Sequence, residues 1–321
     1  MRIFVILAVI AAPVFGQQEL PKETWLPSVF GSHMVLQRDQ EVPVWGWDKP
    51  GQAVRVELST DAVSDRKPVV VETKADETGA WRVQLPATPT GGTYKVSVVG
   101  SKTISMTDVL FGEVWICSGQ SNMAWPVNAA NDSDLERMAA KFPNIRLISV
   151  PQVGTQEPQP NFKGEWTRCS PETVGQFSAV GYFFGRQLHQ TLDVPIGLID
   201  NAWGGSACEA WINRDRLKKD GRFDALLESW QKKEANLDSA MKAWEKRMVT
   251  HREKAAEARK AGKRPPRAPR SPQGEMRGNQ RPANIYNGVL KPTIGYGIRG
   301  AIWYQGESNA SRAYQYRDLF P

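Results

Sequence analysis

Short apolar runs alternate with segments of helical spacing over most of the sequence after residue 110. Four of the runs are rich in β-formers and predict strands: 114–117, 145–150, 195–201 and 298–304. Residues 134–142, with Asp132 or Ser133 as a cap, and residues 178–192 have apolar side chains at helical spacing and predict helices. Because strand, loop and helix repeat in this order, we predict an α/β fold in which a parallel sheet lies between two helical layers.

The preceding segment, residues 25–108, shows strand patterning instead. The runs 42–47, 54–58 and 94–99 alternate or cluster β-forming residues, and glycine- or proline-containing turns separate them. Residues 76–81 resemble a hairpin turn. Short strands at this spacing favour a small β-sandwich domain over 25–108, followed by the α/β domain over 109–321. Two domains also suit a chain of 321 residues.

A long insertion, residues 215–281, separates the third and fourth predicted strands. Its first part has apolar residues at helical spacing from Phe223 to Met248, so we predict a long amphipathic helix or a helical hairpin. Residues 254–281 are rich in Lys, Arg, Ala and Pro, and 265–269 cannot be helical. We expect a solvated, mobile loop there; a patch for anionic glycans or the cell envelope is the alternative.

The net charge of +7 comes from this insertion. It holds 19 Lys and Arg against 10 Asp and Glu, so the remainder of the chain is slightly acidic. No aromatic residue interleaves the basic run, which argues against a nucleic-acid partner.

The N-terminus and the cysteines bear on where the chain acts. Residues 1–16 have a basic residue, a short apolar run and small residues at the end, which predicts a signal peptide and a secreted or periplasmic protein. The run is too short for a stable membrane anchor. Cys117 lies in an apolar strand and is expected to be a buried thiol, whereas Cys169 and Cys208 could form a disulfide. The cysteine spacing does not resemble a zinc site, and we expect neither a metal nor another cofactor.

Three polar loops follow the carboxyl ends of predicted strands: Gly119-Gln120-Ser121-Asn122-Met123, Trp203-Gly204-Gly205-Ser206 and Gln305-Gly306-Glu307-Ser308-Asn309. Sites form at this edge of parallel sheets. Ser121 at a tight turn would expose its hydroxyl, and backbone N–H groups or the Gln305 amide could donate to an oxyanion. Met123 stands where the Gly-x-Ser-x-Gly elbow has its second glycine, which favours another serine-hydrolase family.

These loops, with residues 112–123, 33–38 and 284–288, closely resemble the sialate O-acetylesterase family of SGNH hydrolases. The resemblance implies an SGNH-like hydrolase domain over 109–321 that removes O-acetyl groups from sialic acid or related sugars. It implies Ser121 as the nucleophile and an oxyanion hole of Ser121, Gly205 and Gln305. Asn122, Gly204 and Glu307 would support this site, with Glu307 orienting the third loop.

A serine nucleophile needs a base, normally a histidine held by a carboxylate. The chain has only His33, His189 and His251. His33 lies in the family motif of the β-domain and is expected to be structural, His189 lies in a predicted helix and His251 in the charged insertion, so we expect none of them to be the base. The family places Asp and His late in the chain, after a further strand, whereas this sequence stops at Pro321. We therefore expect that the C-terminal part is missing and that the 321-residue chain is nearly inactive.

Two other functions remain open. One is an acetylxylan or other polysaccharide acetylesterase, which the catalytic loops do not distinguish from a sialate esterase. The other is a glycan-binding protein without catalysis, which the absent base favours and the three intact loops disfavour.

Overall fold

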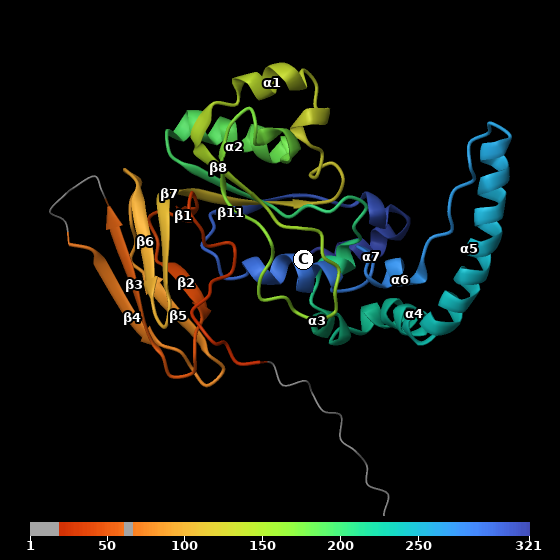
Figure 1. Ribbon diagram of the computed structural model, residues 1–321, viewed down its shortest axis with the longest axis horizontal. Helices are drawn as coiled ribbons and strands as arrows, with labels where there is room; N and C mark the ends of the chain where they lie inside the picture. The colour runs from red at the N-terminus through yellow and green to blue at the C-terminus, as the bar shows by residue number, and fades with distance from the viewer. Residues whose placement is uncertain (1–18, 61–66) are drawn as a thin grey trace, which may run out of the picture.

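The computed structural model describes residues 19–60 and 67–321, so the predicted signal peptide, residues 1–16, lies outside the described part. Up to Gly119, the regular elements of the described chain are all strands (Figure 1). They are β1 (Val35–Gln37), β2 (Val42–Trp47), β3 (Ala53–Thr60), β4 (Val69–Lys74), β5 (Ala80–Leu85), β6 (Tyr94–Val99) and β7 (Thr103–Gly119). The predicted strands at 42–47, 54–58 and 94–99 are confirmed.

Apart from β1, which pairs parallel with β7, these strands form two antiparallel layers. One layer contains β4, β3, β6 and the first half of β7, and the other is the pair β2–β5. Alternate residues of β2 and β6 are buried, which is the pattern of a sheet with one face in a core. The turn at 76–79 forms, but the predicted hairpin is wrong. β4 pairs with β3 and β5 pairs with β2, so this turn connects the two layers.

Strand β7 is far longer than the predicted strand at 114–117. Its first half pairs antiparallel with β6, and its second half pairs parallel with β10 (Ile196–Asp200) and β11 (Gly300–Tyr304). The pairing with β6 shifts register near Asp108, which has a left-handed backbone with φ of 55°. The domain limit that we predict between residues 108 and 109 therefore falls inside one continuous strand.

The second half of β7 belongs to a mostly parallel sheet. β8 (Phe142–Ser149) pairs parallel with β10, and β9 (Thr167–Cys169) pairs antiparallel with β8 at one edge. β11 pairs with β7, and we find no further strand beside it among the described residues. The carboxyl ends of β7, β10 and β11 lie at one edge of this sheet because the three strands are parallel.

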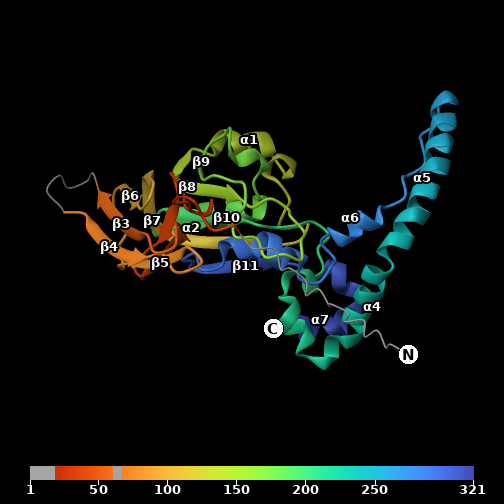
Figure 2. The same cartoon turned by 60° about the horizontal axis from the view of Figure 1, so that its bottom comes forward.

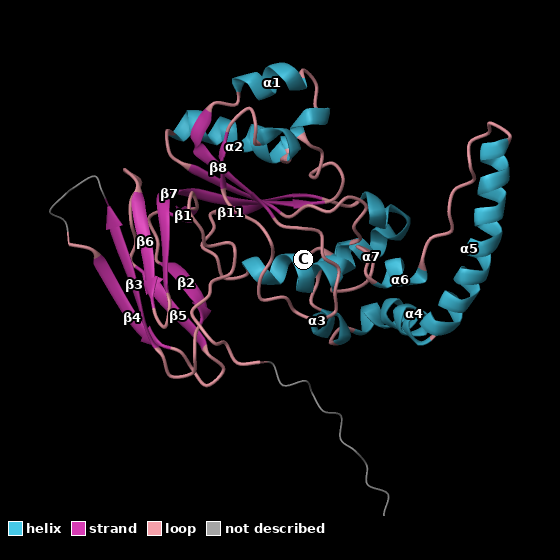
Figure 3. Cartoon of the chain, viewed as in Figure 1, coloured by secondary structure: helices cyan, strands magenta, loops and turns pink. Residues whose placement is uncertain are grey.

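Helices cover both faces of the parallel sheet, so the predicted three-layer α/β fold is confirmed (Figures 1 and 3). α1 (Ser133–Ala139) and α2 (Ala179–Leu192) lie on one face, and the turns at Tyr286–Thr293 lie on the other with α3 (Arg214–Lys218) and α7 (Ala313–Leu319). Ser178 caps α2, because its side chain accepts from the Gly181 backbone N–H. α1 ends three residues earlier than predicted, and its cap residue Asp132 makes no capping hydrogen bond.

The insertion is more helical than the sequence suggests. α4 (Asp224–Ala235) is followed by α5 (Leu237–Lys260), which extends away from the rest of the chain in both views (Figures 1 and 2). The expectation of a loop from residue 254 is therefore wrong for 254–260, where alanine, glutamate, lysine and arginine are all good helix formers. Residues 265–269 are not helical, as predicted, and the short helix α6 (Pro272–Met276) follows.

The interior confirms one cysteine prediction and corrects another. Cys117 is fully buried under α2, and burial raises the pKa of its thiol well above the ordinary value. Cys169 and Cys208 do not form a disulfide; both are buried free thiols in separate apolar clusters. Over residues 19–60 and 67–321, no helix is long and apolar enough to cross a bilayer.

Candidate active site

Backbone hydrogen bonds bring the three polar loops together at the carboxyl edge of the parallel sheet. The Gln120 N–H donates to the Tyr304 carbonyl at 2.9 Å, which joins the first and third loops. The Trp203 N–H donates to the Gly119 carbonyl at 2.9 Å, which joins the first and second loops. Three segments separated by about 80 to 180 residues of sequence therefore form one surface, as parallel-sheet topology requires.

Gly119 determines how closely the loops approach. It has φ of 139°, and a Cβ atom built at this position would lie 2.2 Å from the Tyr304 carbonyl oxygen. Only glycine satisfies both conditions. The chain consequently turns sharply directly after β7, and Ser121 lies two residues beyond the end of the strand.

Ser121 is half-buried, and its side chain and N–H make no hydrogen bond within the described residues. A Cβ atom at Gly204 would lie 3.6 Å from the Ser121 Cα and Cβ atoms, so the second loop packs directly against the serine. Asn122 is exposed and likewise has no hydrogen-bond partner in the described part of the chain.

The side chain of Gln120 links the first loop to the third. Its Oε1 accepts from the backbone N–H groups of Gly306 and Ser308 at 3.1 and 3.3 Å, and its Nε2 donates to a Glu307 carboxylate oxygen at 3.2 Å. Gln120 itself is buried, 3 % exposed, whereas Glu307 is exposed. This geometry fits the expectation that Glu307 orients the third loop. The same hydrogen bonds fix Gln120, the residue directly before Ser121.

The second loop offers a free backbone donor beside Ser121. Gly205 has φ of 72°, and its N–H has no acceptor among the described residues. The carbonyl oxygens of this loop are held from outside: Asn279 Nδ2 donates to Gly204 O at 2.6 Å, and Gln280 Nε2 donates to Gly205 O. The N–H groups of Ser121 and Gly205 are thus both available to an oxyanion.

Gln305 is placed differently from these donors. Its Nε2 already donates to Ser206 O and to Asn309 Oδ1, both at 3.0 Å. Its Oε1 is buried without a partner. The amide of Gln305 would have to release one of its bonds to donate to an oxyanion, so that role stays a prediction.

All three histidines have positions away from the loops. His33 Nδ1 lies 2.6 Å from Asp108 Oδ2, and Asp108 precedes Gly119 by a length of strand of roughly 35 Å. His189 Nδ1 lies 2.7 Å from Val194 O, at the end of α2 that leads into the start of β10. His251 lies in α5. None of them contacts Ser121, which agrees with the low expectation for each as a base.

A carboxylate that the sequence analysis did not single out lies under the first loop. Asp200 ends β10 opposite Cys117 and accepts from the Ala202 N–H at 3.1 Å. Burial raises its pKa to about 6. The next residue, Asn201, is 1 % exposed, and neither atom of its amide has a partner among the described residues. In the described part of the chain, no three His, Cys, Asp or Glu side chains are arranged to hold a metal ion.

Sequence reasoning missed residues that act through tertiary contacts. Gln120 lies in the quoted motif, but its bonds to the third loop depend on how β7 and β11 pair. Asn279 and Gln280 lie at the end of the insertion, where no local pattern marks them as partners of Gly204 and Gly205. The pKa of Asp200 depends on burial by α2 and the first loop.

Comparison with known proteins supports the resemblance. Residues 111–245 match the family model described as carbohydrate esterase, sialic acid-specific acetylesterase. The chain is 29 % identical to mouse (Mus musculus) sialate O-acetylesterase over 308 residues and 27 % identical to the human (Homo sapiens) protein over 297 residues. By these matches the chain is similar to the sialate O-acetylesterase family. A solved carbohydrate acetylesterase from Xanthomonas citri is 34 % identical and superposes with a TM-score of 0.67.

The chain spans about half the length of these family members. The matches cover 91 % of this chain and 53 % of the mouse protein, 88 % and 48 % for the human protein, and 92 % and 55 % for the Xanthomonas structure. All three loops lie within the described part of this chain.

Proposed function

We propose that this chain provides the nucleophile and the oxyanion hole of a carbohydrate O-acetylesterase that acts through an acyl-enzyme on Ser121. The observation that carries the proposal is the packing of Gly204 against Ser121, together with the backbone N–H groups of Ser121 and Gly205, which have no acceptor among the described residues. Donors fixed in this way stabilise the tetrahedral oxyanion without having to reorganise during the reaction.

In the proposed reaction, the Ser121 hydroxyl attacks the acetyl carbonyl and loses its proton to a base. The carbonyl oxygen becomes an oxyanion between the two backbone donors. Collapse expels the sugar alkoxide, which takes up a proton, and leaves acetyl-Ser121 for hydrolysis by water. The described residues supply the donors but no histidine in contact with Ser121, so the chain is expected to turn over slowly.

Sialic acid or a related acetylated sugar is the proposed substrate, because the family members that match are sialate and carbohydrate acetylesterases. We also propose export, supported by the apolar pattern of residues 1–16. A polysaccharide such as xylan is the second candidate substrate, and a panel of acetylated sialosides and xylo-oligosaccharides distinguishes the two.

The test measures p-nitrophenyl acetate hydrolysis and fluorophosphonate labelling for the chain and for Ser121→Ala. We expect slow hydrolysis and labelling, both lost in the variant, and faster turnover in a longer form that carries an Asp–His segment. Ser118→Ala is a matched control, since Ser118 is buried in β7, 4 % exposed. Labelling that persists in Ser121→Ala would refute the assignment, and a longer form without activity would favour a glycan-binding protein.

A further inference from the structure

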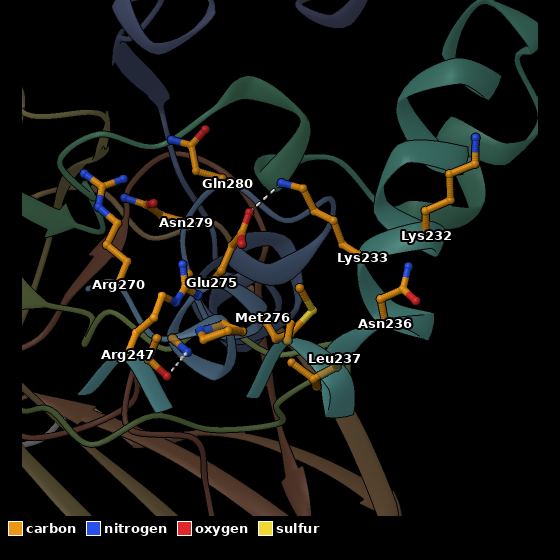
Figure 4. Close-up of a pocket in the computed structure, with 15 residues that line it drawn as sticks. Lys232, Lys233, Asn236, Leu237, Arg247, Arg270, Glu275, Met276, Asn279 and Gln280 are labelled. Carbon is orange, nitrogen blue, oxygen red and sulfur yellow. Dashed lines mark hydrogen bonds and ion pairs between the residues drawn. The ribbon is translucent and has the colours of Figure 1, made fainter. Parts of the chain in front are cut away.

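A pocket of about 830 Å³ lies where the insertion meets the second active-site loop. Its walls come from α4, the first half of α5 and residues 270–280, which include α6 (Figure 4). The volume falls within the range of roughly 300–1,000 Å³ typical of ligand sites. Leu237, Ala240 and Met276 give the pocket an apolar portion beside its charged groups.

The charges in this pocket are unbalanced. Four cations line it, Lys232, Lys233, Arg247 and Arg270, against the single carboxylate of Glu275. Glu275 is paired with Lys233, and in Figure 4 this pair lies between Lys232 on one side and the two arginines on the other. Within the described residues, Lys232, Arg247 and Arg270 have no ion-pair partner.

A specific contact brings the two arginines to the same pocket. Trp244 Nε1 donates to the Pro269 carbonyl at 3.1 Å, which holds the chain after α5 against that helix. Arg247 follows Trp244 by three residues and therefore lies on the same helical face, while Arg270 follows Pro269 directly. Like charges placed together without a counter-ion cost free energy, so this arrangement favours an anionic ligand.

Two residues connect the pocket to the candidate active site. Asn279 and Gln280 line the pocket and also donate to the carbonyl oxygens of Gly204 and Gly205. Gly204 in turn packs against Ser121. A glycan whose acetyl group reaches Ser121 can therefore extend along this loop into the pocket.

We propose that this pocket is a subsite for a carboxylate-bearing sugar of the acetylated substrate, bound through Arg247 and Arg270. Guanidinium groups pair with carboxylates through two parallel hydrogen bonds, which ammonium groups cannot do. The proposal rests on the proposed esterase function for the direction in which the glycan extends. Uronic acids and sialic acids share the carboxylate, and the ligands of the test distinguish them.

The test titrates the full chain with oligosaccharides that carry no O-acetyl ester, so that binding is measured without hydrolysis. Trigalacturonate and sialyllactose are compared with neutral xylotriose by isothermal titration calorimetry at low and high salt. We expect one acidic sugar to bind, more weakly at high salt, and xylotriose not to bind. The double variant Arg247→Gln/Arg270→Gln should weaken binding roughly tenfold or more, since it removes both guanidinium groups that would form charge-assisted hydrogen bonds with the carboxylate.

The matched control is Arg252→Gln/Arg264→Gln, which removes two exposed arginines of the insertion that do not line the pocket. Equal weakening in both double variants, binding of xylotriose equal to that of the acidic sugars, or absence of binding to either acidic sugar would overturn the proposal. The proposal would also be overturned if a single-stranded oligonucleotide bound more tightly than the acidic sugars and both double variants lost this binding. The surface would then bind polyanions in general. Hydrolysis of p-nitrophenyl acetate tests the proposed esterase function separately. This substrate has no carboxylate, so its hydrolysis depends on Ser121 and not on the proposed subsite.

Discussion

Substitution of Asp108 by asparagine tests what holds the two halves of β7 together. The Asp108 carboxylate accepts from Arg146 at 2.7 and 3.1 Å, from Arg168 at 2.8 and 2.9 Å, and pairs with His33 at 2.6 Å. Arg146 is 2 % exposed and also donates to the His33 and Asp108 carbonyls. Asparagine tolerates the left-handed backbone at this position, so the change removes the charge without added backbone strain.

The expected cost is large because Arg146 loses its counter-ion while it stays buried. Removing one partner of a buried ion pair typically costs about 3–5 kcal/mol. Because asparagine keeps one acceptor oxygen and Asp108 is 16 % exposed, we expect the lower end of that range, about 3 kcal/mol. Arg168→Gln is the control: Arg168 is 54 % exposed, and exposed pairs contribute about 1 kcal/mol or less.

Urea unfolding followed by tryptophan fluorescence measures both variants. Burial acts to raise the pKa of Asp108, but hydrogen bonds from Arg146, His33 and Arg168 outweigh it and hold this pKa well below the usual value. The stabilisation by Asp108 is therefore complete above its unfolded-state pKa and is lost as the pH falls below that value. The difference in the free energy of unfolding between wild type and Asp108→Asn should therefore become smaller in acid. A loss under about 1 kcal/mol, or no larger than that of Arg168→Gln, would refute the reasoning.

Two further predictions concern the candidate site. Gly119→Ala should lower the melting temperature, because strain at φ of 139° and a clash with Tyr304 O cost about 1–3 kcal/mol or more. Gly204→Ala is the control and should leave the melting temperature unchanged, because a Cβ atom at Gly204 would make only ordinary contacts. Because burial raises the pKa of Asp200 to about 6, stability should fall as the pH rises from its unfolded pKa through 6, by up to about 3 kcal/mol. Asp200→Asn should remove that fall; an unchanged pH profile in chemical denaturation would contradict it.

The layered fold was predictable because its signals are local. The apolar runs and glycine-bearing loops mark where β10 and β11 end, and helical spacing marks α2 with its Ser178 cap. The length of β7 was not predictable in this way. Polar residues such as Asp108 interrupt its apolar pattern, and only pairing with β6 and ion pairs with Arg146 keep the strand continuous.

In the candidate site too, features set by local sequence could be predicted, and features set by tertiary contacts could not. The positions of Ser121, Gly204 and Gly205 after strands could be predicted, because the carboxyl ends of parallel strands share one edge. The hydrogen bonds of the Gln305 amide to Ser206 and Asn309 could not, because they depend on the side-chain rotamer of Gln305 and on a loop 99 residues earlier in the chain. The helical extent of α5 was also missed, since charge and proline nearby suggested a loop.

Because β7 is continuous, the position of Ser121 depends on the number of residues in the distant first half of this strand. Residues paired with β6 and residues paired with β10 and β11 share one run of alternating faces from Thr103 to Gly119. Deleting a single residue from the first half would either break the pairing with β6 or turn every later side chain to the opposite face, so that Cys117 would leave its place under α2. Single-residue deletions should therefore be tolerated in the loop 261–268 and not in β7, and a library of such deletions scored for folding would show this contrast directly.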